Sequence, residues 1–228
     1  MARPIVIVAS SRKGNWMLMS ALARHPACFV HSDQWFSRPE FAGMSPHDAV
    51  MQLFESPGAA PRIVHSHYPL PYKSRTDNAL FYDLLVKKEA TFIFLSRLNR
   101  VRWYVSLELA RRDRAWDTSK PPRETEAAIS LNCTEFLKTV NQDEHAYRTA
   151  REFIDQRSQW LDVPYESLAA SPFEALQSLQ RDLDLPKMPL LPTTFKQHDR
   201  PLRDLIHNYD EFASDLRVCG SVYADGLE

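Results

Sequence analysis

Short runs of apolar residues alternate along the chain with longer segments in which apolar residues recur every three or four positions. The apolar runs cover residues 4–9, 27–31, 62–66, 91–95 and 161–165. Short, mainly apolar runs of this length are typical of the strands of a parallel sheet, and the longer segments have helical periodicity. The alternation predicts an α/β fold in which a mainly parallel five-stranded sheet carries helices on both faces, in three layers.

Proline and cap residues mark several predicted element ends. One helix start is predicted from three residues: Ser171 in a cap position, Pro172 at the first helical position, and Glu174 where a capping box has a glutamate. Pro201 predicts another, and Pro164 fits only an edge or an end of its strand because it lacks a backbone donor. Helices are predicted at residues 16–24, 45–55, 77–88 and 100–115, in a long pair across 123–160, and at 172–183 and 201–217.

The first predicted strand ends in a polar turn that contains a glycine and leads directly into a helix. Residues 5–22 read IVIVASSRKGNWMLMSAL, so that Ser11, Arg12, Lys13 and Gly14 occupy the turn. Such a turn directs backbone N–H groups inward, and the positive end of the helix dipole lies behind them. We therefore predict a phosphate site with two added cations. The alternative is an ordinary strand-to-helix turn with solvated cations.

The order of residues in this turn differs from that of a nucleoside triphosphatase loop. In the pattern GxxxxGK[ST] the lysine follows the glycine, and a hydroxyl residue then holds Mg²⁺. Here Lys13 precedes Gly14, and Asn15 and Trp16 follow it. The sequence therefore favours a phosphate ligand that is bound without a metal ion.

A second cationic position follows the fourth predicted strand. Arg97 comes directly after that strand, and Ser106 falls in the early turns of the next predicted helix. Ligands of open parallel sheets bind outside the carboxyl ends of the strands. The two strand ends are therefore predicted to face one ligand that carries two separated phosphates.

Four sequence blocks occur in the order found in the PAPS-dependent sulfotransferases. They read SRKGNWMLMSALARHP, RLNRVRWYVSLELA, VPYESL, and KQ followed by PLRDLIHNYDE. The chain resembles this family, most of all the bacterial branch that includes trehalose and nodulation-factor sulfotransferases. The resemblance implies a P-loop-like sulfotransferase fold and transfer of a sulfuryl group from PAPS (3′-phosphoadenosine 5′-phosphosulfate) to an acceptor hydroxyl. It also implies a carbohydrate or glycolipid acceptor.

The resemblance implies which residues bind the donor. The first turn would hold the 5′-phosphosulfate, and Arg97 with Ser106 would hold the 3′-phosphate. Tyr165, in the VPYESL block, is left open between packing at its strand end and contact with the ligand. The implied donor-binding residues are Ser11, Arg12, Lys13, Gly14, Asn15, Trp16, Arg97, Ser106, Lys196 and Gln197.

Some positions depart from the family's usual pattern. Asn15 and Trp16 stand where small hydroxyl residues are usual, and Lys13 stands where serine is common. Arg97 precedes Ser106 by nine positions, one more than in many members. Two alternatives therefore stay open. One is a module that binds PAPS or PAP without turnover, and the other, supported only by the strand-turn-helix pattern, is a P-loop kinase.

Sulfuryl transfer needs a base beside the acceptor hydroxyl, and candidates follow the second and third strands. Asp33, in HSDQWF, is the leading candidate, and His65 and His67, in IVHSH at a spacing that shares one strand face, are the alternatives. Asp33 has an alternative use as a turn or helix cap. These residues together with His31 have metal-ligand chemistry, but their spacing is no metal signature. No metal is predicted.

The charge of the whole chain is nearly balanced, with 28 basic and 29 acidic side chains. A balanced charge offers nucleic acid or an anionic membrane no general attraction. Neither is predicted as a partner, and no apolar run reaches the roughly 18 residues of a membrane span. Cys28, Cys133 and Cys219 lack a CxxC pair, which predicts reduced packing thiols. We expect one domain over residues 1–228, a cytoplasmic location, and an oligomeric state that the sequence leaves open.

Overall fold

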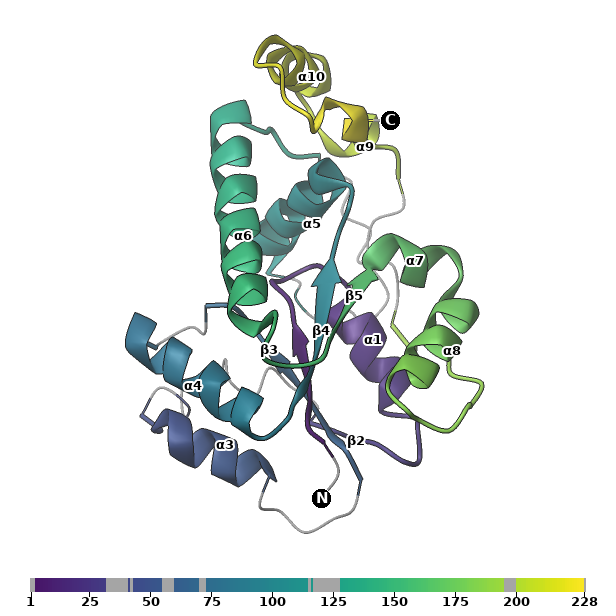
Figure 1. Ribbon diagram of the computed structural model, residues 1–228. Helices are drawn as coiled ribbons and strands as arrows, with labels where there is room; N and C mark the ends of the chain where they lie inside the picture. Colours follow the sequence, from purple (N-terminus) through teal and green to yellow (C-terminus); the bar gives the residue numbers. More distant parts are fainter. Residues whose placement is uncertain are drawn as a thin grey trace. The chain divides into compact units, whose positions relative to one another are not determined.

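The central element of the fold is a five-stranded parallel sheet in the order β2-β3-β1-β4-β5 (Figure 1). The strands are β1 Ile5–Val8, β2 Phe29–Val30, β3 Arg62–Ser66, β4 Thr91–Ser96 and β5 Trp160–Pro164. The computed structural model describes residues 3–31, 41, 43–54, 60–69, 73–114, 116, 128–194 and 200–227. All five predicted strands are confirmed, and Pro164 is the last residue of an edge strand, as predicted.

The helices follow the strands along the chain and continue after the last one. They are α1 Asn15–Leu22, α3 Pro46–Phe54, α4 Arg75–Lys87, α5 Arg100–Asp113, α6 Cys133–Ile154, α7 Tyr165–Ala170, α8 Pro172–Asp182, α9 Leu202–Leu205, α10 Tyr209–Val218 and the 3₁₀ helix η2 Ala224–Leu227. No described helix is long and apolar enough to cross a membrane.

The helices differ from the predicted ones in several details, and α7 was not predicted. Within the described part of residues 123–160, the single helix α6 replaces the predicted pair. The helix predicted at 201–217 is divided into α9 and α10, because Ile206 is extended and forms a parallel bridge with Ile129. Ser171 and Pro172 occupy the predicted positions at the start of α8, but the described Ser171 side chain makes no cap hydrogen bond.

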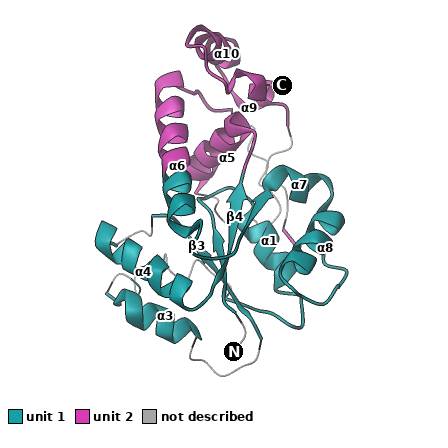
Figure 2. Ribbon diagram, in the orientation of Figure 1, with its two compact units in different colours: residues 1–96, 146–192 teal, residues 97–145, 193–228 magenta. Residues whose placement is uncertain are grey.

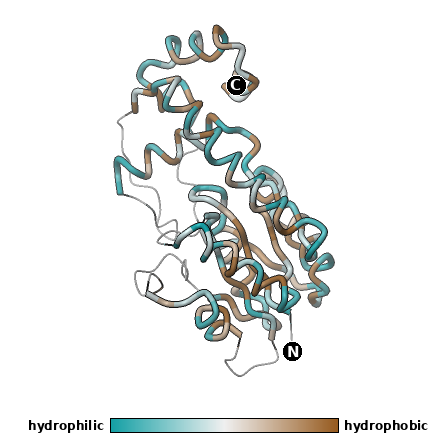
Figure 3. Tube along the Cα trace, turned by 60° about the vertical axis from the view of Figure 1, so that its left-hand side comes forward, coloured by the Kyte–Doolittle hydropathy of each residue, from teal (hydrophilic) through white to brown (hydrophobic). Residues whose placement is uncertain are grey.

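Alternate strand residues enter two hydrophobic clusters, one on each face of the sheet. Val6 and Val8 pack in a cluster that includes residues of α3, α4 and α6. Ile5 and Ile7 pack on the other face with residues of α1, α7 and α8. The sheet therefore has helices on both faces, as predicted, and Figure 3 shows the hydrophobic colour following its strands.

The chain forms two compact units, each built from two segments (Figure 2). Unit 1, Met1–Ser96 with Ala146–Pro192, holds the sheet. Unit 2, Arg97–His145 with Thr193–Glu228, is helical and has its own hydrophobic cluster around Phe136. The two units are described separately, and the assignment of residues 1–228 to one domain stays a prediction.

Candidate functional site

The turn that follows β1 has the backbone expected of an anion site. Gly14 is the N-cap of α1 with φ 90°, and Arg12 has φ 67°, so both are in the left-handed region. Turns of this kind gather successive N–H groups on one side. The first N–H groups of α1 have no partner within the helix, and the first turn of α1 contains no acidic residue. The positive end of α1 is therefore not neutralised by the helix itself.

Gly14 is packed against the ring of Tyr165, the first residue of α7. A Cβ atom at position 14 would lie 2.7 Å from Cδ2 of Tyr165, closer than such atoms approach one another. Gly14 was predicted as part of a phosphate turn, and its described neighbour is the ring of a tyrosine that directly follows β5. Tyr165 thus takes the packing role, one of the two that the sequence left open.

Ser10, which precedes the predicted site residues, carries a buried hydroxyl group. Its Oγ atom has no hydrogen-bond partner among the described residues. Leaving a buried hydroxyl unpaired costs about 1–3 kcal/mol, so this atom is a group that a bound oxyanion would satisfy. The sequence analysis missed Ser10, although its place in the serine pair at the strand end was a usable signal.

Lys13 is buried rather than solvated, with 1% of its surface exposed. Its Nζ atom lies 5.2 Å from the centroid of the Tyr147 ring on α6, within the range of a cation–π contact. The Tyr147 hydroxyl donates to Oδ1 of Asp162 at 2.6 Å. The alternative of a turn with solvated cations is therefore wrong for Lys13. Asn15 is also buried, and Trp16 is half-buried.

His65 is fully buried in β3 and holds its proton on a known nitrogen. Its Nε2 atom lies 3.0 Å from the carbonyl oxygen of Ala9, which can only accept, so Nε2 carries the hydrogen. The buried Nδ1 atom has no hydrogen-bond partner among the described residues. Burial and then the neighbouring His67 lower the pKa of His65 to about 3. His65 is therefore enclosed and neutral near pH 7.

His67 lies just beyond β3 and is half-buried. Its ring packs edge to face on the ring of His65, with centroids 4.8 Å apart. Burial, with a smaller contribution from the charge of Lys13, lowers the pKa of His67. A neutral imidazole can accept a proton near pH 7. Of the two histidines, His67 is the less buried one.

Of five further predicted site residues, three lie outside the described part of the chain. Asp33, Lys196 and Gln197 lie outside the described residues. Arg97 and Ser106 belong to unit 2, where Ser106 is buried in α5. No group of three potential metal ligands occurs in the described part of the chain.

The turn also lies at the topological switch point of the sheet. The chain leaving β1 reaches β2 on one side of β1, whereas the chain leaving β4 reaches β5 on the opposite side. In open α/β sheets ligands bind outside the carboxyl ends of the two strands where this reversal occurs. The turn of Arg12 and Gly14 follows one of these strands, and Arg97 follows the other directly.

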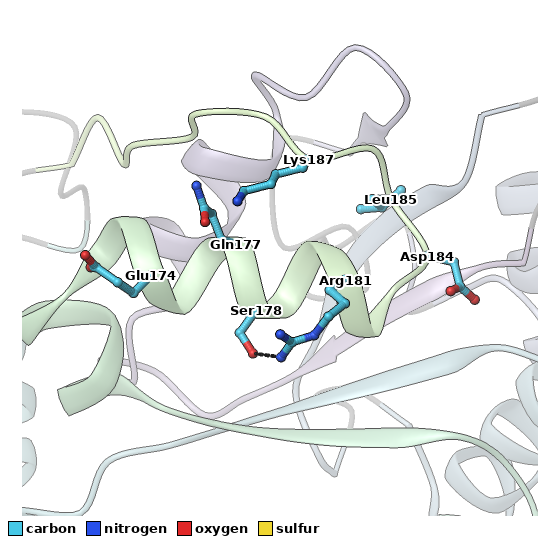
Figure 4. A pocket seen from close by; sticks show the side chains of 7 residues that line it. All are labelled: Glu174, Gln177, Ser178, Arg181, Asp184, Leu185 and Lys187. Carbon is cyan, nitrogen blue, oxygen red and sulfur yellow. Dashed lines mark hydrogen bonds between the residues drawn. The ribbon is translucent and has the colours of Figure 1, made fainter.

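A separate hollow of about 540 Å³ lies on α8 and the loop after it (Figure 4). Within it Arg181 donates to Oγ of Ser178 at 2.8 Å. It contains none of the predicted site residues. The lining residues are Glu174, Gln177, Ser178, Arg181, Asp184, Leu185 and Lys187.

Comparison with known proteins identifies the fold. No protein-family model matches the chain, and no curated protein matches its sequence. A sulfotransferase from Alicyclobacillus acidocaldarius is similar with a TM-score of 0.54 and 16% identity, over 100% of this chain and 95% of that one. The mouse sulfotransferase SULT7A1, complexed with PAP, has a TM-score of 0.52 and 15% identity, over 81% of this chain and 60% of the mouse chain.

These similarities define the fold class, which is a parallel α/β fold with helices on both faces of the sheet. Within that class, the chain has the fold of the sulfotransferases. The predicted fold and the resemblance from which it came are therefore confirmed at the level of the fold. The match with this chain covers 60% of the length of the mouse protein.

Proposed function

We propose that this protein is a sulfotransferase that moves a sulfuryl group from PAPS to a hydroxyl group of an acceptor. The turn after β1 carries the proposal, because it combines left-handed Arg12 and Gly14 with the buried, unsatisfied hydroxyl of Ser10. The sulfotransferase fold supports it. So does the mouse protein of that fold, whose structure is a complex with PAP.

In this proposal the two ends of the donor have different partners. The backbone N–H groups of the turn, the Arg12 guanidinium and the Ser10 hydroxyl bind the 5′-phosphosulfate. Arg97 and Ser106 bind the 3′-phosphate, and Lys196 and Gln197 complete the nucleotide site. Charge-assisted hydrogen bonds of this kind contribute roughly 1.5–3 kcal/mol each.

The reaction is an in-line displacement at sulfur. The acceptor oxygen attacks the sulfur atom, the bond between sulfur and the bridging phosphate oxygen breaks, and PAP leaves. Negative charge on the sulfuryl and bridging oxygens is stabilised by the N–H groups and by Arg12, which are already in place before the reaction. We assign neutral His67 as the base that takes the acceptor proton, with Asp33 as the alternative. The acceptor is a carbohydrate or glycolipid, as the resemblance implies.

Donor binding is tested by calorimetry with PAP in the absence of divalent metal ions. The intact protein is expected to bind PAP, and Arg12→Ala and Arg97→Ala are each expected to weaken binding by about 10- to 100-fold. Arg181→Ala, which removes an exposed arginine of α8, is the matched control and should leave binding unchanged. Absence of PAP binding by the intact protein would overturn the proposal, and magnesium-dependent ATP binding would indicate a kinase instead.

Turnover is tested with labelled PAPS and a mixed glycan and lipid extract. Loss of the base should reduce the rate by about 10²- to 10⁴-fold in His67→Gln while PAP affinity is kept. Asp33→Asn is measured beside it to decide between the two candidates. A protein that binds PAP but sulfates nothing in the extract would fit the alternative of a binding module without turnover.

A further inference from the structure

Two of the three cysteine thiols lie together in unit 2. Cys133 is the first residue of α6, and Cys219 directly follows α10, 86 residues later. Their Sγ atoms are 3.6 Å apart. Cys28 lies in unit 1, where its Sγ atom is 3.7 Å from Nδ1 of His25. The sequence analysis took all three as separate packing thiols, and the pairing of Cys133 with Cys219 is the exception.

The two paired thiols differ in exposure in a way that suits stepwise chemistry. Cys133 is buried in the cluster around Phe136, whereas Cys219 is exposed. An exposed thiol can be reached by a soluble oxidant, and a sheltered thiol beside it can then resolve the product. Exposure therefore decides the order in which the two sulfur atoms react.

The surroundings of Cys219 leave room for the small movement that a bond requires. A disulfide has its sulfur atoms about 2.05 Å apart, so Cys219 must approach Cys133 from the observed 3.6 Å. Cys219 ends α10, Gly220 after it has φ 62°, and Val218 before it is 84% exposed. A shift of this exposed helix end breaks the hydrogen bond that Cys219 Sγ donates to the carbonyl oxygen of Asp215 at 2.6 Å.

We propose that Cys133 and Cys219 form a reversible disulfide when the protein meets a small-molecule disulfide such as oxidised glutathione. The Cys219 thiolate attacks one glutathione sulfur, forms a mixed disulfide and releases one glutathione. The Cys133 thiolate then attacks the Cys219 sulfur, breaks the mixed disulfide and releases the second glutathione. The protein loses two electrons and two protons, and the two glutathione thiols that leave have gained them.

The second step is slow at neutral pH. Burial, and then the hydrogen bond and charge of Cys219 and the charge of Asp215, raise the pKa of Cys133 to about 11. Only a small fraction of Cys133 is the reactive thiolate at pH 7. Converting Cys219 to a mixed disulfide removes the contribution of Cys219 to the raised pKa of Cys133. The first step therefore makes the second one easier.

The bond would join the start of α6 to the end of α10. Residues of both helices belong to the hydrophobic cluster around Phe136, together with residues of α5 such as Val101. A cross-link that closes so long a loop restricts the unfolded chain more than the folded one. Oxidation should therefore raise the thermal midpoint of unfolding, by about 5–15 °C for a chain of this size.

The test treats the folded, full-length protein with oxidised glutathione and maps its peptides by mass spectrometry. We expect a peptide pair joined through Cys133 and Cys219 that is lighter by two hydrogen atoms, reversal by dithiothreitol, and the rise in thermal midpoint. Cys133→Ser and Cys219→Ser should lose the cross-link. Cys28→Ser, the matched control, should keep it.

Two results would overturn the proposal. One is a mixed disulfide that remains on Cys219 without progressing to Cys133, and the other is a covalent dimer formed through Cys219. The wild-type cross-link and its reversal decide the question even if a serine variant folds poorly. PAP binding is not measured in this test, so its result is independent of the proposed function.

Discussion

At the scale of single residues, Gly14 is restricted by two independent constraints. Its backbone has φ 90°, a conformation that side chains disfavour, and the Tyr165 ring occupies the place of a Cβ atom. Either constraint alone would select glycine. The position is therefore a packing point between two strand ends as well as a proposed phosphate contact.

Replacing Gly14 with alanine should separate this role from ordinary glycine flexibility. We expect Gly14→Ala to lower the free energy of unfolding by about 2–3 kcal/mol through backbone strain and the Tyr165 clash, and to weaken PAP binding. Urea unfolding and calorimetry measure the two effects. Gly43→Ala is the control, because nothing lies within 4 Å of the added methyl group. Equal losses in both variants would contradict this account.

The buried His65 should make stability depend on pH. Folding lowers its pKa from 6.5 to about 3, so the unfolded chain binds the proton more readily. The contribution of His65 to the free energy of unfolding is therefore fully present above pH 6.5. It declines as the pH falls toward 3, by up to about 1.4 kcal/mol per pH unit.

Urea midpoints between pH 7.5 and pH 4 test this expectation. His65→Gln keeps an amide N–H that can reach the carbonyl oxygen of Ala9 but has no titrating group. The free energy of unfolding of this variant should depend less on pH than that of the wild type, because unfolding takes up about one proton fewer. His67 is retained in both proteins. Parallel curves would show that His65 is not the titrating group.

At the scale of elements, the break between α9 and α10 is held by a backbone bridge and by the side chain of Asn208. The Asn208 side chain accepts a hydrogen bond from Leu131 N and donates one to Leu131 O, each at 2.9 Å. The adjacent bridge joins Ile129 to Ile206. Asn208 thus acts as an extra strand residue between distant parts of unit 2.

Removing this side chain leaves both backbone groups of Leu131 without their partner. Asn208→Ala should therefore lower the free energy of unfolding by about 1–3 kcal/mol, which chemical denaturation followed by circular dichroism would measure. Asn141→Ala, at an exposed position in α6, is the control, and alanine's helix propensity should leave that variant at least as stable. An equally large loss of stability in Asn141→Ala would contradict the assigned role of Asn208.

The sequence predicted those elements whose signal is local. The strands are short, mainly apolar runs, so β1 through β5 were found within two residues of their ends. The division of the last helix was missed because it depends on Ile129, which lies 77 residues before Ile206. No pattern within residues 201–217 reports such a partner.

The candidate site divides in the same way. The polar turn, its glycine and the following helix are adjacent in sequence and were predicted. The burial of Lys13 beside Tyr147, the unsatisfied Ser10 hydroxyl and the ring of Tyr165 against Gly14 all arise from contacts between segments distant in the chain. Tertiary packing alone determines them.

At the scale of the whole molecule, the chain passes between its two units three times, after Ser96, His145 and Pro192. The second passage falls inside α6, so one helix supplies residues to both units. Each unit completes its hydrophobic cluster only when its later segment has been added.

This interleaving limits how such a gene can be rearranged. A single recombination breakpoint anywhere in the coding sequence leaves at least one unit with halves from different parents. Neither unit can therefore be inherited as an exchangeable cassette. The lineage of this protein should vary by substitution and by loop-length changes, with both units diverging together.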